Sequence, residues 1–342
     1  MRNETKKNSP SSKPGARIEK NGQNRAAIIY NPTKVDLDAL RKAVALEESL
    51  NGWMETVWWA TSEDDPGEEV GRRAINHPVD LVLVAGGDGT VSAVADSLRG
   101  SKIPLAIIPS GTGNLLARNL LLTLDDLQYS VNAAFSGDDR DIDIGVVEVK
   151  RENGSTDRHA FLVMAGVGID AKMIENTDPE LKSRIGWLAY LLAIFKALQD
   201  KSQLRFRYTF DETDTGMVRA HSLIIGNCGT LPGNIWLLPD AAIDDGLFDI
   251  VFLRPQGYFG WVQIWIKVAL EYGVVRRTKI GRKLLGNDKE IRALRYNTAT
   301  TFSATFDQLE VIELDGDTFG KTTELCAWIE PKALTVRIPF TK

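Results

Sequence analysis

The chain has 342 residues, 43% of them hydrophobic and 25% charged, so it is long enough for two globular domains. Its formal net charge of −5 argues against a general nucleic-acid binder. Its two cysteines, Cys228 and Cys326, exclude a disulfide framework or a thiolate metal site and fit a reducing cytoplasm. The longest apolar run, Ile185–Phe195, is about eleven residues, too short for a membrane span, and we interpret it as a buried helix.

The N-terminal residues 1–24 are rich in Asn, Ser, Pro, Gly and Lys and contain no apolar run for a signal sequence. We predict a disordered tail. Its excess of Lys and Arg is suited to contact with anionic lipid, but a solubilising tail is the simpler interpretation.

Residues 25–141 alternate between strand and helix patterns. The expected strands are 26–30, 56–60, 81–85 and 104–108, and the expected helices are 37–50, 67–76, 91–98 and 124–135. Strands that alternate with helices predict a parallel sheet with crossover helices on its faces. The sequence therefore predicts an N-terminal α/β domain with a parallel, Rossmann-like sheet.

From residue 142 to 332 short strand patterns dominate. The expected strands are 143–149, 159–166, 202–210, 217–227, 246–253, 293–305 and 309–314, with a last one at 334–339. Two helical insertions, Glu180–Leu198 and Gly257–Val275, interrupt them. Runs of strands separated by turn residues predict a mainly β C-terminal domain with a β-sandwich fold.

Two stretches combine a strand, a tight turn and a helix. Val79–Thr90 reads VDLVLVAGGDGT, and Ile107–Arg118 reads IIPSGTGNLLAR. Glycines lack the Cβ atoms that would keep backbone N–H groups away from an anion, and the following helix directs its positive end at the same place. Both turns would lie at the carboxyl ends of parallel strands, so we predict that they hold phosphate.

Asp88 stands inside the first glycine turn, where a carboxylate would repel bare phosphate. We therefore expect it to hold a cation, and Mg²⁺ is the one that phosphate sites use. The alternative is that the glycines only permit a tight turn and that Asp88 caps a helix. The sequence has no G-x-x-x-x-G-K-[ST] motif, and neither turn has the third glycine of the dinucleotide fingerprint in register.

These turns, together with three further motifs, resemble those of a known family, the soluble diacylglycerol kinases and sphingosine kinases. The resembling motifs are GGDGT at Gly86–Thr90, PSGTGN at Pro109–Asn114, YNP at Tyr30–Pro32, AAIDDGLFDIVFL at Ala241–Leu253 and LDGD at Leu314–Asp317. The resemblance covers most of the chain from about residue 26. Two departures are Thr33-Lys34, where Ser-Gly is common, and Asp317, which replaces the usual Glu.

The resemblance implies an ATP-dependent lipid kinase with its active site in the cleft between the two domains. ATP, with Mg²⁺ at Asp88, would contact Asn31, Pro32, Thr61, Gly86, Gly87, Asp88, Gly89, Thr90, Gly111, Thr112 and Asn114. The acceptor would be the hydroxyl of a membrane lipid, either diacylglycerol-like or sphingoid-like. The last strand, 333–340, would return to the first domain.

The turn Asp315-Gly316-Asp317 ends an apolar strand. By spacing alone it is an ordinary hairpin turn, but the resemblance implies that it faces the GGDGT turn across the cleft. One of its carboxylates would then take the proton of the acceptor hydroxyl. We predict Asp315 as this base, because a strand fixes its position, and Asp317 as auxiliary, because it is shorter than the Glu it replaces.

A second acidic turn, Asp244-Asp245-Gly246, is also an ordinary turn by default. By resemblance, Asp245 would bind a structural Mg²⁺ together with the backbone carbonyls of Ala242 and Leu247, away from the chemistry.

The stretch Tyr258–Lys283 places aromatic residues before basic ones, an order that suits peripheral contact with the inner face of a membrane, although core packing is the alternative.

Two functions other than a lipid kinase stay open. A kinase of a soluble acceptor is one, because NAD kinases resemble the GGDGT turn too. A binding module without transfer chemistry is the other, and the three carboxylates Asp88, Asp315 and Asp317 speak against it. The number of subunits is also open, with a homodimer as one option.

Overall fold

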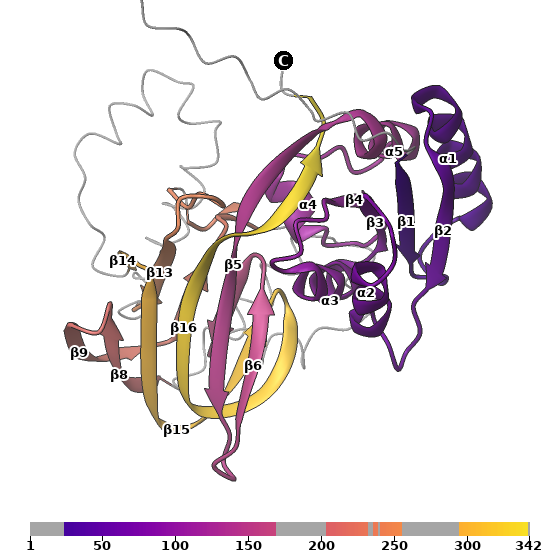
Figure 1. Cartoon of the computed structure of the whole chain (residues 1–342). Helices are drawn as coiled ribbons and strands as arrows, with labels where there is room; N and C mark the ends of the chain where they lie inside the picture. The colour runs from indigo at the N-terminus through magenta and orange to yellow at the C-terminus, as the bar shows by residue number, and fades with distance from the viewer. Residues whose placement is uncertain (1–23, 169–202, 232–234, 239, 255–293, 341–342) are drawn as a thin grey trace, which may run out of the picture.

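The computed structural model describes residues 24–168, 203–231, 235–238, 240–254 and 294–340 (Figure 1). The tail up to residue 23, the predicted insertions Glu180–Leu198 and Gly257–Val275, and the basic residues that follow up to Lys283 lie outside the described residues. Within the described part, no helix is long and apolar enough to cross a membrane.

Four parallel strands form the N-terminal sheet in the order β4-β3-β1-β2. They are β1 (Arg25–Tyr30), β2 (Met54–Ala60), β3 (Leu81–Gly86) and β4 (Leu105–Pro109). Every residue of β3 is buried, as expected for a central parallel strand covered on both faces. The predicted parallel α/β sheet is confirmed.

Five helices accompany this sheet in the described chain: α1 (Leu37–Asn51), α2 (Glu68–Ile75), α3 (Asp88–Leu98), α4 (Leu115–Asn119) and α5 (Leu127–Ser136). Helices α1 and α5 pack on one face, and α2, α3 and α4 pack on the other.

Helix α5 begins later than predicted because Asp126 caps it by accepting the Tyr129 N–H. Helix α3 begins three residues earlier than predicted, so Asp88 lies in its first turn. The short α4 is the helix expected after the second glycine turn.

The C-terminal part is rich in strands: β5 (Asp138–Lys150), β6 (Thr156–Phe161), β7 (Met164–Val167), β8 (Leu204–Phe210), β9 (Asp214–Ala220), β10 (Ser222–Gly226), β11 (Thr230–Leu231), β12 (Ile235–Trp236), β13 (Phe248–Leu253), β14 (Leu294–Ala299), β15 (Thr301–Leu314) and β16 (Asp317–Ile338). The segments 159–166, 217–227 and 293–305, each predicted as one strand, are each divided between two strands. The break between β6 and β7 arises where the N–H groups of Leu162 and Val163 donate to a distant carboxylate rather than to a neighbouring strand.

The long strand β16 links the two parts of the molecule. It pairs in antiparallel fashion with β15 and β5, and its last residues pair in parallel with β4, with Val336 opposite Leu105. In Figure 1 this yellow strand runs from the β-rich part up to the α/β part. The domain boundary expected at residue 141 falls inside β5 and stays a prediction.

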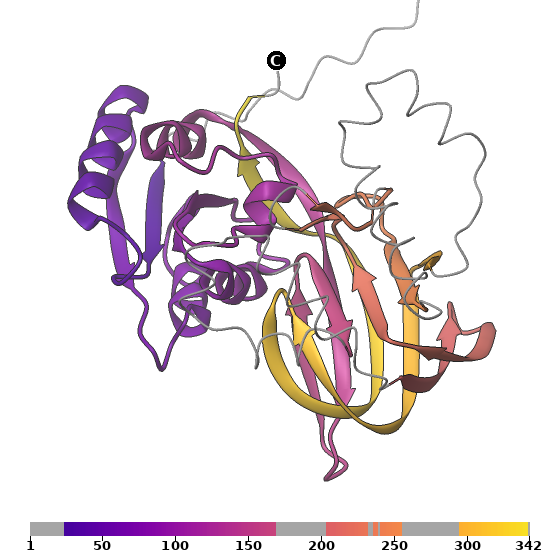
Figure 2. The same cartoon turned by 180° about the vertical axis from the view of Figure 1, so that it is seen from behind.

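The β-rich part encloses its own hydrophobic core, made from the inward faces of β5 to β10, β13, β15 and β16. Aromatic rings dominate it: Phe206 lies 5.5 Å from Phe252, and Phe210 lies 5.2 Å from Phe302, centroid to centroid. Figure 2 shows this body of strands beside the α/β part. The structure therefore has the expected α/β domain followed by a β-rich domain.

Candidate active site

The carboxyl ends of the N-terminal strands form one rim that carries the residues predicted to bind ATP. The Asn31 N–H, just after β1, donates to the Ala85 carbonyl of β3, and the Thr61 N–H, just after β2, donates to the Tyr30 carbonyl. The Ser110 N–H, just after β4, donates to the Gly86 carbonyl. Among the residues predicted to contact ATP, Thr61 and Thr90 are buried, whereas Pro32 and Thr112 are exposed.

The glycines of the two turns allow the turns to touch each other. A Cβ atom on Gly111 would lie 2.8 Å from the Cα of Gly87, and a Cβ atom on Gly113 would lie 2.5 Å from Oδ2 of Asp88. Both distances are shorter than van der Waals contact. The glycine pattern thus also serves direct packing between the turns, in addition to the approach of an anion.

Asp88 holds the second turn in place. Its Oδ2 accepts the Asn114 N–H at 2.9 Å, and its Oδ1 accepts the Leu115 N–H at 2.5 Å, so it caps the start of α4. Asn114 has left-handed backbone angles, and its side chain bonds to both the N–H and the carbonyl of Gly111. A carboxylate oxygen has more than one lone pair, so these bonds leave acceptor capacity for a cation.

Arg118 is a further candidate, absent from the predicted site residues. Its Nε donates to the Gly113 carbonyl at 2.6 Å, which ties the guanidinium to the second glycine turn. The sequence signal was a cation four residues after Asn114, one helical turn beyond a predicted phosphate turn.

Asp315 lies at the opposite side of the site, in the turn between β15 and β16, and is 7% exposed. Its Oδ2 accepts the Ser92 hydroxyl at 3.0 Å and the Leu162 N–H at 2.8 Å. Its Oδ1 accepts the N–H groups of Val163 at 2.8 Å and Met164 at 3.0 Å. Burial raises the pKa of this carboxyl, while the four hydrogen bonds lower it.

Asp317, two residues on, is the exposed carboxylate of this turn. Its Oδ2 lies 3.1 Å from the position that a Cβ of Gly89 would occupy, so it faces the first turn of α3. Partial burial and then the negative charge of Asp88 raise the pKa of Asp317. The structure thus places Asp317 near Asp88, whereas hydrogen-bond donors enclose Asp315. These surroundings do not favour the prediction of Asp315 as the base and Asp317 as auxiliary.

The second acidic turn makes contacts of its own in the described residues. Asp244 pairs with Arg140 at 2.7 Å, and Asp245 accepts the Leu247 N–H at 3.0 Å. Burial, followed by the charges of Asp245 and Asp240, raises the pKa of Asp249 to about 6. No group of three or more carboxylate, histidine or cysteine side chains arranged around a common metal position is found in the described residues.

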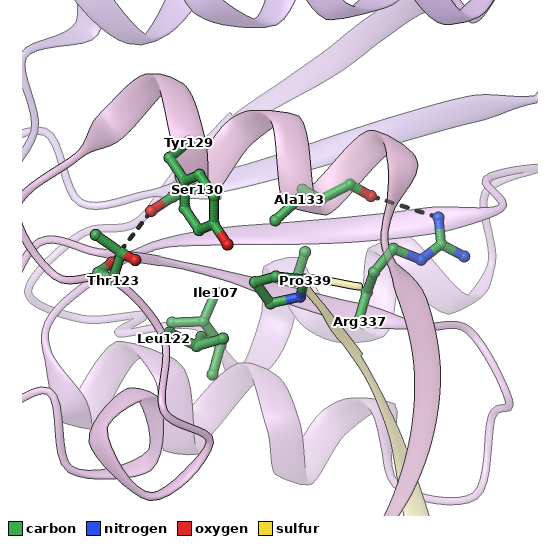
Figure 3. Close-up of a pocket in the computed structure, with 10 residues that line it drawn as sticks. Ile107, Leu122, Thr123, Tyr129, Ser130, Ala133, Arg337 and Pro339 are labelled. Carbon is green, nitrogen blue, oxygen red and sulfur yellow. Dashed lines mark hydrogen bonds between the residues drawn. The ribbon is translucent and has the colours of Figure 1, made fainter. Parts of the chain in front are cut away.

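Figure 3 shows a pocket elsewhere, between α5, β4 and the end of β16. Its lining includes Tyr129, Ser130 and Arg337 but none of the predicted site residues. The Arg337 guanidinium pairs with Asp139 at 2.6 Å. Because its charged residue is already paired, this pocket belongs to the packing of α5 on the sheet rather than to the phosphate turns.

Two touching glycine turns at the carboxyl edge of a parallel sheet, faced by a carboxylate from a β-rich domain, are the arrangement of a phosphotransferase. The family described as the diacylglycerol kinase catalytic domain matches residues 25–147. The family described as the YegS C-terminal NAD kinase beta sandwich-like domain matches residues 163–272.

Individual relatives agree with this match. A diacylglycerol kinase of Staphylococcus epidermidis is 30% identical over 239 residues, which cover 67% of this chain and 70% of the relative. One of Bacillus subtilis is 28% identical over 245 residues, covering 70% and 77%. The crystal structure of a Bacillus anthracis diacylglycerol kinase shares the fold, with a TM-score of 0.69 and 21% identity over 93% of this chain and 98% of that one. The chain belongs to the diacylglycerol kinase family and is a phosphotransferase with an alcohol group as acceptor.

Proposed function

We propose that the protein transfers the γ-phosphoryl group of ATP to the hydroxyl of a membrane lipid, diacylglycerol-like or sphingoid-like, with Mg²⁺. The observation that carries the proposal is the approach of Asp317 from the β-rich domain to the first turn of α3. This approach places an exposed carboxylate beside the backbone N–H groups where a phosphoryl group would lie.

The nucleotide would lie along the rim formed by the ends of β1 to β4. The helix start at Asp88 would face its phosphates with backbone N–H groups. The turn from Gly111 to Asn114 would lie against them with glycine backbone, since the N–H groups of Gly111 and Asn114 are already bonded. Arg118, fixed to the Gly113 carbonyl, would add positive charge at the same turn.

Asp317 is the base that the geometry favours. Its carboxylate is exposed and faces the first turn of α3, so it is free to accept a proton from an acceptor hydroxyl there. In the proposed step the lipid O–H gives its proton to Asp317, the lipid oxygen bonds to the γ-phosphorus, and the bond from that phosphorus to the bridging oxygen breaks and releases ADP. Asp315 cannot serve in this way, because its oxygens are buried and already accept four donors.

The residues present fit a divalent cation. Asp88 keeps lone pairs beyond the two capping bonds that it accepts, and oxygen ligands of this kind are what Mg²⁺ prefers. Bound there, Mg²⁺ would neutralise the charge of the phosphoryl oxygens. Asp88 would hold it while still capping α4.

The test is transfer of labelled phosphate from ATP to a panel of lipids in mixed micelles, with diacylglycerol, a sphingoid base and NAD as acceptors. We expect labelling of one lipid class that depends on added Mg²⁺. Labelling of NAD alone would favour the kinase of a soluble acceptor, and labelling of no lipid would overturn the proposal.

A substitution at Gly89 tests the approach of Asp317. The added methyl of Gly89→Ala would lie 3.1 Å from Asp317 Oδ2 and push this side chain away. Alanine is a better helix residue than glycine, so we expect no fall in melting temperature but a turnover about tenfold lower, since small displacements of a reacting group cost rate. In an Asp317→Asn background the same change should have no further effect; an additive loss would show that Gly89 acts through something else.

Asp245 is proposed as a ligand of a structural Mg²⁺, with the carbonyls of Ala242 and Leu247. Asp245→Ala should then abolish the thermal stabilisation by Mg²⁺, which would be about 2.7 kcal/mol at a hundredfold excess over the Kd. Asp244→Ala is the matched control, because Asp244 has the same charge but pairs with Arg140 on the surface. An equal response of both variants to Mg²⁺ would contradict the metal assignment.

Peripheral contact with the inner face of a membrane, and assembly into a homodimer, also belong to the proposal. The stretch expected to make the membrane contact, Tyr258–Lys283, lies outside the described residues.

A further inference from the structure

The buried carboxylate of Asp315 joins two parts of the molecule. Its partner Ser92 comes from α3, the helix that begins at Asp88. Its other donors, the N–H groups of residues 162–164, come from the link between β6 and β7 in the β-rich domain. The Asp315 side chain therefore connects the hairpin turn both to α3 and to residues 162–164.

The hairpin does not need Ser92 to form. Leu314 pairs with Asp317, and Glu313 pairs with Thr318, across the β15–β16 ladder. The backbone of Asp315 is also held, because its N–H donates to the Met164 carbonyl at 2.9 Å. The Ser92 hydrogen bond instead sets where the finished turn lies relative to α3.

The position of the turn decides the position of Asp317. Asp317 opens β16 two residues after Asp315, and its Oδ2 already lies beside Gly89 in the first turn of α3. A shift of the turn along α3 would therefore change the distance from this carboxylate to the phosphate turn by a similar amount. Displacements of about 1 Å at a reacting centre cost about a hundredfold in rate.

We propose that the hydrogen bond between Ser92 and Asp315 is a positioning contact. It would hold the Asp317 carboxylate beside the first turn of α3, at the distance that proton transfer from the acceptor hydroxyl requires. The inference rests on the proposed kinase function and assigns these two residues no contact with substrate. It also explains why a turn with two carboxylates buries one of them: the buried carboxylate places the exposed one.

The test compares Ser92→Ala with Ser92→Thr and with Ser97→Ala. Threonine keeps the hydroxyl that reaches Asp315, whereas alanine removes it. Ser97 is the matched control on the same helix, because its hydroxyl donates to the Glu68 and Ala93 carbonyls, away from the turn. Kinetic constants are measured for ATP and for the lipid that the parent phosphorylates.

We expect Ser92→Ala to lower kcat about tenfold with the KM for both substrates nearly unchanged. Ser92→Thr should restore most of kcat, and Ser97→Ala should resemble the parent. A purely stabilising role would instead give equal kcat values at a temperature where all variants are folded, and that result would overturn the inference.

A second measurement does not depend on activity. Amide hydrogen exchange at Asp317 and at residues 162–164 should be faster in Ser92→Ala than in the parent or in Ser97→Ala, because the turn loses its anchor on α3. If the parent phosphorylates no lipid, the proposed function fails, yet faster exchange would still support the anchor. Unchanged exchange in Ser92→Ala would overturn the positioning role whatever the activity.

Discussion

Asp317→Asn is expected to lower lipid phosphorylation by about two to four orders of magnitude, the usual loss when a general base is removed. The amide has nearly the same shape as the carboxylate but accepts no proton at neutral pH. Since Asp317 would act on the lipid hydroxyl and the rim of the N-terminal sheet would hold the nucleotide, binding of ATP should be nearly unaffected. The measurement is kcat under saturating substrates, with ATP affinity determined separately.

The matched control is Asp317→Glu, which keeps the carboxylate and restores the residue common in resembling kinases. Its longer side chain still starts from the first residue of β16, beside Gly89. We expect it to retain most of the turnover. An active Asp317→Asn protein would remove Asp317 as the base, and a dead Asp317→Glu protein would show that placement rather than proton acceptance limits the reaction.

Much of the fold was predictable because the hydrophobic periodicity and the apolar runs of the sequence coincide with the helices and strands of the structure. The all-apolar run of β3 and the glycines after it defined a central parallel strand and its turn. The resemblance implied that the last strand returns to the first domain, but local patterns did not show that one strand, β16, extends from Asp317 to Ile338 and pairs with β15, β5 and β4 in turn. Such pairings join segments far apart in the chain, and a local pattern carries no information about them.

The sequence motifs named the candidate site residues, and the structure shows surroundings of these residues that the motifs could not show. The motifs located both glycine turns and both carboxylates of the Asp315-Gly316-Asp317 turn. Which carboxylate is buried depends on Ser92 and on the β6–β7 link, which lie more than a hundred residues away in the chain. Asp315 is held in place as expected, but backbone donors enclose it, whereas the freer Asp317 faces the first turn of α3.

The second large effect is expected at Asp88, where asparagine removes the negative charge proposed to hold Mg²⁺. Turnover should fall by about two orders of magnitude or more, as when the charge neutralisation of a metal is lost. Stability should fall as well, by about 1–3 kcal/mol, because the new amide group would face the N–H of Asn114 or Leu115 and one capping bond would be lost.

Asn114→Gly separates these two effects. Glycine adopts the left-handed backbone of Asn114 and keeps the N–H that donates to Asp88, while the side-chain bonds to Gly111 disappear. This variant loosens the turn with the Asp88 charge in place, so it should lose stability without a change in the Mg²⁺ concentration that gives half-maximal activity. Asp88→Asn should need much more Mg²⁺. If both variants lose turnover equally and keep the Mg²⁺ requirement of the parent, Asp88 acts only as the cap of α4, and the metal must be held elsewhere.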